Sequence, residues 1–228
     1  MKTLAALLFF LSSTAFAVNK VPLLNGKLYI PVGYDTNDPV EVTVLGSLPD
    51  SCHRSPTYEV ERSGRNINIY LYAYYVPEDR GCRKISVPYQ ETINLGFFQE
   101  GNYLVQLKSS RVISKAPLKI KTATSSLQDD FQYGNVMNIL EDEDSRVIKL
   151  VGTNPTNCLI FDKLVTEIQN DVIVLRPRFR EEGICEEEPT EFSINYEVPF
   201  LARHPRGVLL HVRVMGGRSF NYLFRNRL

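Results

Sequence analysis

The sequence has few of the residues that reactive sites use. It contains three histidines in 228 residues, and the motifs GxSxG, HExxH and a phosphate-binding glycine loop are absent. A hydrolytic triad needs an imidazole base held against a nucleophile. We expect His53 and His204 in loops and His211 in a strand, where a hydrogen-bonded structural histidine is the commoner case. We therefore predict a protein that is not an enzyme and has no cofactor.

Excess charge of either sign is also missing. The chain has 26 basic and 26 acidic residues, for a formal net charge of zero. Nucleic-acid-binding proteins usually carry a basic excess, so no nucleic-acid partner is predicted. Acidic residues do cluster twice, in a run and around Cys185: Glu141, Asp142, Glu143 and Asp144, then Glu181, Glu182, Glu186, Glu187 and Glu188. A calcium site needs 6–8 oxygen ligands in ordered spacing, which neither cluster offers, so we interpret them as solvated loops and predict no metal site.

Long hydrophobic runs are absent after the first residues. Residues 1–17 have Lys2, an apolar run over residues 4–11 and the small-residue ending Ala15-Phe16-Ala17. This order is typical of a cleaved secretory signal peptide and is too short to span a bilayer. No cysteine follows the expected cleavage site, so the acceptor for a lipid anchor is lacking. We predict a signal peptide over 1–17 and an exported protein, periplasmic or extracellular, without a membrane anchor.

Helical periodicity is the next absence. No segment of 11 or more residues has convincing 3.6-residue periodicity with caps, and the best candidate, residues 158–170, is rich in β-branched residues. Short runs rich in Val, Ile, Tyr and Phe are frequent, and Gly, Pro, Asn and Asp clusters separate them, as in strands joined by tight turns. Examples are YEVER (58–62), NINIYLYAYYV (66–76), ETINLGFF (91–98), DVIVLRPRF (171–179) and EFSINYEV (191–198). The sequence therefore predicts an all-β protein.

An internal match divides the chain. GSLPDSC at residues 46–52 and GTNPTNC at residues 152–158 share the spacing GxxPxxC, and each follows a strand-like run. Gly26 and Gly134 lie at similar distances upstream, and a second cysteine follows each motif. We interpret this order as two tandem copies, with domains over 18–125 and 126–228. About seven short strands per copy predict two immunoglobulin-like antiparallel β-sandwich domains, with small barrels as the alternative. We expect KAPLKIK (115–121) to add the last strand of the first domain.

The four cysteines fall two in each half. Of three possible connectivities, only Cys52–Cys82 and Cys158–Cys185 keep each half self-contained, as expected for an exported protein. Each bridge would close a loop of about 30 residues and contribute about 3–4 kcal/mol. The alternative is a metal site or redox pair. It lacks CxxC spacing and a histidine set, apart from His53 beside Cys52.

The first half resembles a known domain family. VTVLGSLPDSC (42–52), IYLYAYYVPEDRGC (69–82), VPYQETINLGFF (87–98) and GNYLVQL (101–107) are similar to a bacterial exported β-sandwich domain with the pattern GxLPDxC, a later cysteine and GxYxVxVNG. The resemblance covers residues 24–108 well and 132–228 more loosely, since Arg180 stands where Pro77 is expected. It implies a β-sandwich with a disulfide between the two cysteines, no established activity and no catalytic residues.

Tyrosines form the most suggestive surface. In the strand over 66–76, Tyr70, Tyr72 and Tyr74 share one face. The other face would hold Ile67, Ile69, Leu71, Ala73 and Tyr75. If the aliphatic face is core, the tyrosine row lies outside and could bind a protein or glycan partner. The alternative is that the row packs against the second domain or the linker. At matching positions of the second half we place Ile173, Leu175 and Pro177, which are also apolar.

These features together favour a non-catalytic exported binding or structural protein built from two disulfide-bonded repeats. One alternative is a protease inhibitor, with the disulfide-tethered segment 46–56 as its inhibitory loop. Another is a periplasmic chaperone-like protein that presents a sheet edge to an added strand.

Overall fold

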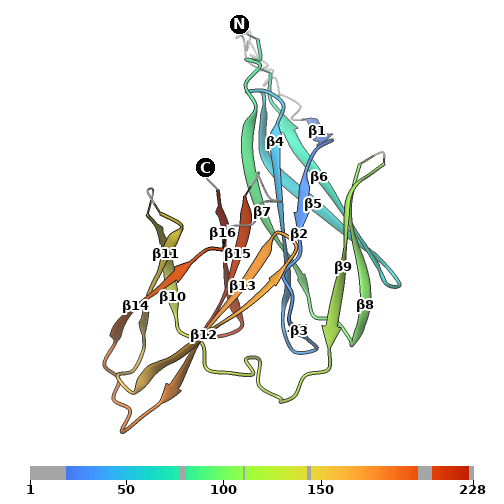
Figure 1. Cartoon of the computed structure of the whole chain (residues 1–228). Helices are drawn as coiled ribbons and strands as arrows, with labels where there is room; N and C mark the ends of the chain where they lie inside the picture. Colours follow the sequence, from blue (N-terminus) through green and yellow to red (C-terminus); the bar gives the residue numbers. More distant parts are fainter. Residues whose placement is uncertain (1–18, 78–80, 110, 143–144, 200–206, 226–228) are drawn as a thin grey trace, which may run out of the picture.

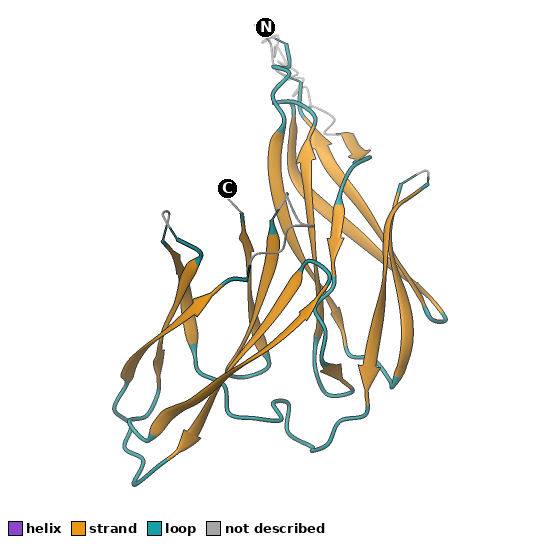
Figure 2. Ribbon diagram, in the orientation of Figure 1, coloured by secondary structure: helices purple, strands orange, loops and turns teal. Residues whose placement is uncertain are grey.

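The computed structural model of the chain describes residues 19–77, 81–109, 111–142, 145–199 and 207–225. The predicted signal peptide and His204 lie outside these residues. Within them the regular structure is made of strands, as predicted, and none of it is a helix long and apolar enough to cross a bilayer. The chain forms two β-sandwich units, which lie side by side in Figures 1 and 2.

The first unit is made of two sheets. The larger has the order β1-β6-β8-β9-β3, and β5 pairs with the other edge of β6; the smaller has the order β2-β4-β7. The nine strands are β1 (Asn19–Pro22), β2 (Lys27–Tyr29), β3 (Tyr34–Asp35), β4 (Val40–Leu48), β5 (His53–Ser63), β6 (Asn66–Tyr75), β7 (Val87–Gly96), β8 (Gly101–Lys108) and β9 (Val112–Lys121). The segment KAPLKIK therefore lies in β9, as expected.

The first core follows from the alternation along β4 and β6. Side chains at every second position point between the two sheets. On β4 these are Val40, Val42 and Val44, and on β6 they are Ile67, Ile69, Leu71 and Ala73; all are fully or almost fully buried. The aliphatic face of β6 is therefore the core face, as the sequence predicted, and its other face is turned outward.

The second unit has a similar arrangement. One sheet has the order β10-β11-β14 and the other β12-β13-β15-β16. The strands are β10 (Val136–Glu141), β11 (Val147–Asn154), β12 (Leu159–Gln169), β13 (Val172–Glu181), β14 (Thr190–Glu197), β15 (Val208–Val214) and β16 (Arg218–Phe224). Ile148, Leu150, Ile173, Leu175 and Leu210 are among the side chains of its separate core.

The sheets are not purely antiparallel, contrary to the expectation. β6 pairs in parallel with β8, β13 with β15, and the short β3 with β9. After β6 the chain crosses to the opposite sheet as β7 and returns as β8, and β14 makes the same crossing after β13. Two crossings bring the chain back in its original direction, so β8 runs parallel to β6 and β15 runs parallel to β13.

Each unit contains one disulfide. Cys52 is bonded to Cys82 and Cys158 to Cys185, with Cα–Cα distances of 5.3 and 4.8 Å. Both distances lie within the ordinary range for disulfides. The predicted pairing within each half is confirmed.

The two units pack against each other through outward-facing side chains. Tyr29 of β2 forms a buried cluster with Val172 and Val174 of β13 and Leu209 of β15, and Leu45 and Leu223 pack at its margin. The segment between β9 and β10 crosses from one unit to the other at one end of the molecule (Figure 1). It is tied to both units: Ala123 N–H donates to Thr36 Oγ1 (3.1 Å) and Gly216 N–H to Asp129 Oδ2 (2.9 Å). We call this contact region the seam.

Candidate functional site

The tyrosine face is the outer surface of β6 with its neighbours on β1 and β5. Tyr70 and Tyr72 are half-buried and Tyr74 is 38% exposed. In the sheet register Tyr72 lies between Thr57 of β5 and Pro22 of β1. The described contacts across the seam come instead from the stretch that runs from β2 to β4 and from β7. The alternative that the row packs against the second unit or the linker is therefore not what the structure has.

Charged neighbours fix the tyrosine rings. Lys20 Nζ lies 4.2 Å from the centroid of the Tyr72 ring and pairs with Glu59. The Tyr70 hydroxyl donates to Glu61 Oε2 at 3.2 Å. Partial desolvation and then these carboxylates raise the pKa of Tyr70 and Tyr72, so both hydroxyls remain protonated. The face thus offers aromatic rings bordered by polar groups in fixed positions, a composition suited to binding.

The sequence alignment of this row with the second unit was wrong. The hairpin registers pair Ser63 with Asn66 in the first unit and Gln169 with Val172 in the second. The separation that relates Cys52 to Cys158 therefore relates Tyr70, Tyr72 and Tyr74 to Arg176, Arg178 and Arg180. Ile173 and Leu175 point into the core instead. The tyrosine face has no tyrosine counterpart in the second unit.

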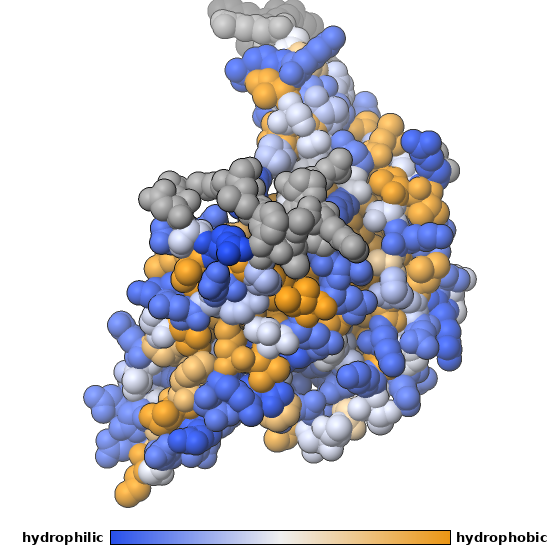
Figure 3. Space-filling model, in the orientation of Figure 1, coloured by the Kyte–Doolittle hydropathy of each residue, from blue (hydrophilic) through white to orange (hydrophobic). Residues whose placement is uncertain are grey.

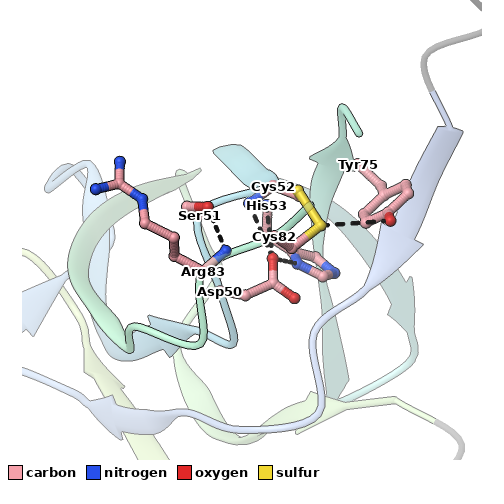
Figure 4. Close-up of a disulfide and its surroundings, with 7 residues drawn as sticks. All are labelled: Asp50, Ser51, Cys52, His53, Tyr75, Cys82 and Arg83. Carbon is pink, nitrogen blue, oxygen red and sulfur yellow. Dashed lines mark hydrogen bonds and ion pairs between the residues drawn. A yellow bond between two sulfur atoms is a disulfide. The ribbon is translucent and has the colours of Figure 1, made fainter. Parts of the chain in front are cut away.

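The first disulfide lies beside a histidine–aspartate pair (Figure 4). His53 Nδ1 lies 2.7 Å from Asp50 Oδ1, which also accepts the backbone N–H groups of Cys52 (2.9 Å) and His53 (3.2 Å). The His53 hydrogen bond is the main cause that lowers the pKa of Asp50. These bonds close the turn between β4 and β5, and His53 is the first residue of β5 rather than a loop residue. The His53–Asp50 pair therefore has a structural role, which is to close this turn.

The same cluster offers no metal site. Asp50, Cys52 and Cys82 are the group of three potential ligands that the described part of the chain brings together. Both sulfurs are joined in the disulfide, and metal binding needs free thiolates. The acidic residues around Cys185 are exposed, as a solvated loop requires. Glu143 and Asp144 of the other acidic run lie outside the described residues.

The segment 46–56 does not form a long projecting loop. It contains the end of β4, a short turn at residues 49–52 and the start of β5. Cys52 within it is fully buried. An inhibitory loop must present several consecutive residues to an enzyme's cleft, and strand pairing on this segment works against that geometry.

The seam contains polar groups that sequence reasoning did not single out as a site. His211 on β15 is buried, and its Nδ1 lies 2.8 Å from Asn221 Oδ1. Burial, with smaller contributions from Arg213 and Arg176, lowers the pKa of His211 to about 3. The histidine is therefore neutral near pH 7 and is structural, as its predicted strand position suggested. Alternation along β15 could have drawn attention to Arg213, because it shares a face with His211.

A family model matches part of the first unit. Residues 42–112 match the ORF11 beta-sandwich domain. The match runs from β4 to the first residue of β9 and so covers less than half of the chain. It agrees with the β-sandwich that the sequence resemblance implied. No curated protein and no solved structure matches the chain.

Surface hydrophobicity does not point to a different site. Figure 3 shows hydrophobic residues in small patches among hydrophilic ones on this face of the molecule. Exposed apolar side chains lie on several strands, such as Met137 on β10 and Ile160 on β12. Isolated exposed apolar residues are normal for a folded protein.

Proposed function

We propose that this protein is an exported, non-catalytic binding protein that contacts a protein or glycan partner through the tyrosine face of its first unit. The observation that carries the proposal is the position of Tyr70, Tyr72 and Tyr74 on an outer sheet face away from the seam, with Tyr74 38% exposed. Tyrosine gives large contact area at low conformational cost, and its hydroxyl can exchange hydrogen bonds with a partner.

Export is supported by the disulfides and by the expected signal peptide. Two disulfides indicate an oxidising compartment, such as the periplasm or the extracellular space. Residues 1–17 have the three parts of a secretory signal. A bacterial origin is supported only by the resemblance of residues 24–108 to an exported bacterial domain.

Duplication of one ancestral domain is part of the proposal. It is supported by a glycine–aromatic pair at the same point of both sandwiches: Gly46 of β4 faces Tyr89 of β7, and Gly152 of β11 faces Phe192 of β14. The crossings between sheets also follow the same order. The replacement of the tyrosine row by Arg176, Arg178 and Arg180 would then restrict partner binding to the first copy.

The test compares substitutions inside and outside the row. Wild-type protein, Tyr72→Ser and Tyr74→Ser are applied to a glycan array and to a pull-down from the exported fraction of the source cells. Tyr58→Ser is the matched control, because Tyr58 is 37% exposed and alternates to the opposite face of β5. We expect the row variants to lose about tenfold or more in capture, which corresponds to about 1.4 kcal/mol, and the control to bind like wild type.

Melting temperatures of all four proteins separate binding from packing. Unchanged capture by Tyr72→Ser and Tyr74→Ser, whether or not their melting temperatures fall, would contradict the proposal. Equal loss of capture in Tyr58→Ser would also contradict it, because the effect would not belong to the face.

A second candidate, a chaperone-like protein, is favoured by one edge strand. β5 and β12 each have 11 residues and lie at sheet edges. β5 contains Pro56, whose missing N–H protects an edge, whereas β12 lacks proline and exposes Ile160 and Ile168. If β12 accepts a strand, Ile160→Lys with Ile168→Lys should abolish suppression of aggregation of an unfolded client. Equal suppression by wild type and variant would exclude this candidate.

A further inference from the structure

The seam joins unlike faces of the two units. On the first unit it uses the outer face of the smaller sheet, where Tyr29 and Leu45 pack into the buried cluster. On the second unit it uses the outer face of the larger sheet, where Val174, Leu209 and Leu223 receive them. Because each unit has both kinds of face, the seam leaves one of each uncovered. These are the outer face of β10-β11-β14 and the outer face of β6-β8-β9.

The strand registers show which residues occupy the seam positions on the uncovered small sheet. The register of β10 with β11 puts Leu140 at the place that Tyr29 has in the register of β2 with β4, and Val151 at the place of Leu45. Leu140 is 47% exposed, whereas Tyr29 is only 1% exposed beneath the second unit. Exposure alone would not single out Leu140, but its position does, because it is the counterpart of a residue that the seam buries.

An open hollow on the same face lacks the wall that its counterpart has. In the first unit the hollow lies over Gly46 and Tyr89, and β16 of the second unit forms its other side, where Gln90 Nε2 donates to the Asn221 carbonyl oxygen at 3.2 Å. In the second unit a hollow of about 500 Å³ lies over Gly152. Among the described residues only this unit lines it: Met137, Val151, Gly152, Thr153, Glu191, Phe192 and Ser193. The face therefore has the form of a seam face without its partner.

The uncovered large sheet contains the counterparts of the receiving residues. β8 pairs with β6 as β15 pairs with β13, so Leu104 takes the place of Leu209. β9 pairs with β8 as β16 pairs with β15, which puts Pro117 at the place of Leu223. Leu104 is half-buried and Pro117 is exposed. Asn68 stands where the second unit has a valine, so this face is more polar than its counterpart in the seam.

Charges on the two uncovered faces complement each other. Pro88 of the first unit and Arg225 of the second line the same hollow in the seam. Their counterparts are Glu191 on β14 and Lys119 on β9, which are both exposed and have no ion-pair partner among the described residues. A contact that repeated the seam between two copies of the chain would bring this acid and this base together. Complementary charges of this kind fix the register of an interface.

We propose that the protein associates with further copies of itself head to tail. The outer face of β10-β11-β14 of one copy docks on the outer face of β6-β8-β9 of the next, so the contact repeats the seam between molecules. It joins two different patches and leaves one of each free at the ends of the assembly. Lys149 stands where the seam buries Thr43, so the contact is more polar than the seam. We therefore expect reversible association that depends on protein concentration.

This contact does not depend on the partner proposed for the tyrosine face. Tyr72 and Tyr74 lie beyond the part of β6 that pairs with β8, whereas the docking residues lie on that part and on the two strands beside it. Self-association is read from the mass of the protein in solution, and partner binding is read from capture. Either proposal can therefore fail without the other.

The experiment measures the mass of the full mature chain by sedimentation velocity, from about 1 μM to about 1 mM. The wild-type mass should rise with concentration. Leu140→Lys blocks the small-sheet face and Leu104→Lys blocks the large-sheet face, so each variant alone should associate about tenfold or more weakly. Ile168→Lys is the control, because Ile168 is also 47% exposed but lies on β12, in the other sheet of the second unit. It should associate like the wild type.

Mixing the two blocked variants tests the head-to-tail geometry. Leu140→Lys keeps an intact large-sheet face and Leu104→Lys keeps an intact small-sheet face. The mixture should therefore form complexes of one copy of each and grow no further, although neither variant associates alone. If Leu104→Lys lowers the melting temperature, Lys119→Glu takes its place, because Lys119 is exposed.

A charge exchange tests the register. Glu191→Lys should weaken association, because it places two bases opposite each other. Adding Lys119→Glu to the same chain should restore association, because the two charges are then exchanged and again complementary.

Three results would overturn the proposal. The first is a wild-type mass that stays that of a single chain over the whole concentration range. The second is association of either blocked variant alone as strong as that of the wild type, which for Leu104→Lys would indicate a two-fold contact between like faces. The third is a loss in Ile168→Lys as large as that in Leu140→Lys.

Discussion

Arg213 of β15 and Asp38, in the turn between β3 and β4, form an ion pair across the seam with side-chain exposures of only 8% and 5%. Burial is the largest single effect and disfavours the charged guanidinium, but the hydrogen bond to Asp38 and the charges of Asp38, Tyr34 and Tyr133 together outweigh it and raise the pKa of Arg213. Asp38 also accepts the backbone N–H of Asp35 at 3.0 Å. The pair therefore joins the two units at a point that water hardly reaches.

Breaking this pair from one side should destabilise the protein strongly. Asp38→Asn leaves the Arg213 charge buried and unpaired, which costs about 3–5 kcal/mol. The free energy of unfolding, measured by urea denaturation, should fall by that amount. The double variant Asp38→Leu/Arg213→Leu should lose less than the single variant, because no uncompensated charge remains.

An exposed ion pair provides the comparison. Arg146 and Glu197 lie 3.3 Å apart, with side chains 39% and 69% exposed. Solvent screening limits such pairs to about 0–1 kcal/mol, so Glu197→Gln should change stability little. A loss in Asp38→Asn no larger than that in Glu197→Gln would show that the seam pair is not important for stability.

The glycines opposite aromatic residues should resist substitution. A Cβ on Gly46 would lie 2.4 Å from the Tyr89 hydroxyl oxygen, and one on Gly152 would lie 2.2 Å from the Asn135 carbonyl oxygen. Overpacking of this kind costs about 1–3 kcal/mol. We expect Gly152→Ala to cost more than Gly46→Ala, because backbone cannot move aside as a side chain can.

Thermal denaturation of the variants checks this order. Burial raises the pKa of Tyr89 to about 12, so it is its neutral ring that covers Gly46. Adding Tyr89→Ala to Gly46→Ala should remove the clash, so the double variant should be less destabilised than the sum of the two single variants. Strict additivity would show that the two residues do not compete for space.

Each disulfide should stabilise its own unit. Replacing Cys52 and Cys82 by serine opens a loop with a sequence separation of 30 residues, and the separation is 27 for Cys158 and Cys185. The chain-entropy estimate gives a loss of about 3–4 kcal/mol in either case. Calorimetric melting of both double-serine variants, with reduced wild type as reference, measures the losses. No change in melting for either variant would contradict the prediction.

Stability should depend on pH through His211. The ordinary pKa of 6.5 applies in the unfolded chain, whereas that of the folded protein is about 3. Between these values unfolding takes up a proton, so the folding free energy that His211 contributes near pH 7 decreases as pH falls below about 6.5. The slope from this one group approaches about 1.4 kcal/mol per pH unit towards the acidic end of that range.

The measurement is the difference in unfolding free energy between pH 7 and pH 5. Comparison with His211→Gln cancels the contribution of the carboxyl groups common to both proteins. We expect the wild type to lose more stability on acidification than the variant, even if the variant is less stable at pH 7. Equal losses would mean that His211 is not held neutral.

The strands, the core face of β6 and the disulfide pairing could be predicted because each has a local signal. Alternation places Ile67, Ile69 and Leu71 on one face whatever the surroundings, and paired cysteines in each half need only the assumption of compact units. The direction of β8 relative to β6 had no such signal, because it depends on which sheet receives β7.

The tyrosine row was found from period alone, but its counterparts were not. Alternating apolar residues give the same pattern at either of two alignments one residue apart, so Ile173 and Leu175 could be aligned with the tyrosines. Only the hairpin register between β12 and β13 shows which residues of the two units correspond. The buried pair of Asp38 and Arg213 could not be predicted, because the two residues lie far apart in the sequence and in different units. Only the docking of the two sandwiches brings them together.

The apolar cluster of the seam has a consequence for how the chain folds as it is made. Tyr29 and Leu45 are made early, but Leu209 and Leu223, which cover them, belong to the last described strands. A chain synthesised from its N-terminus therefore completes its first sandwich while this apolar patch is still exposed to water. Until the hairpin of β15 and β16 is made, the unfinished chain exposes a surface that invites aggregation, and the final strands remove that hazard.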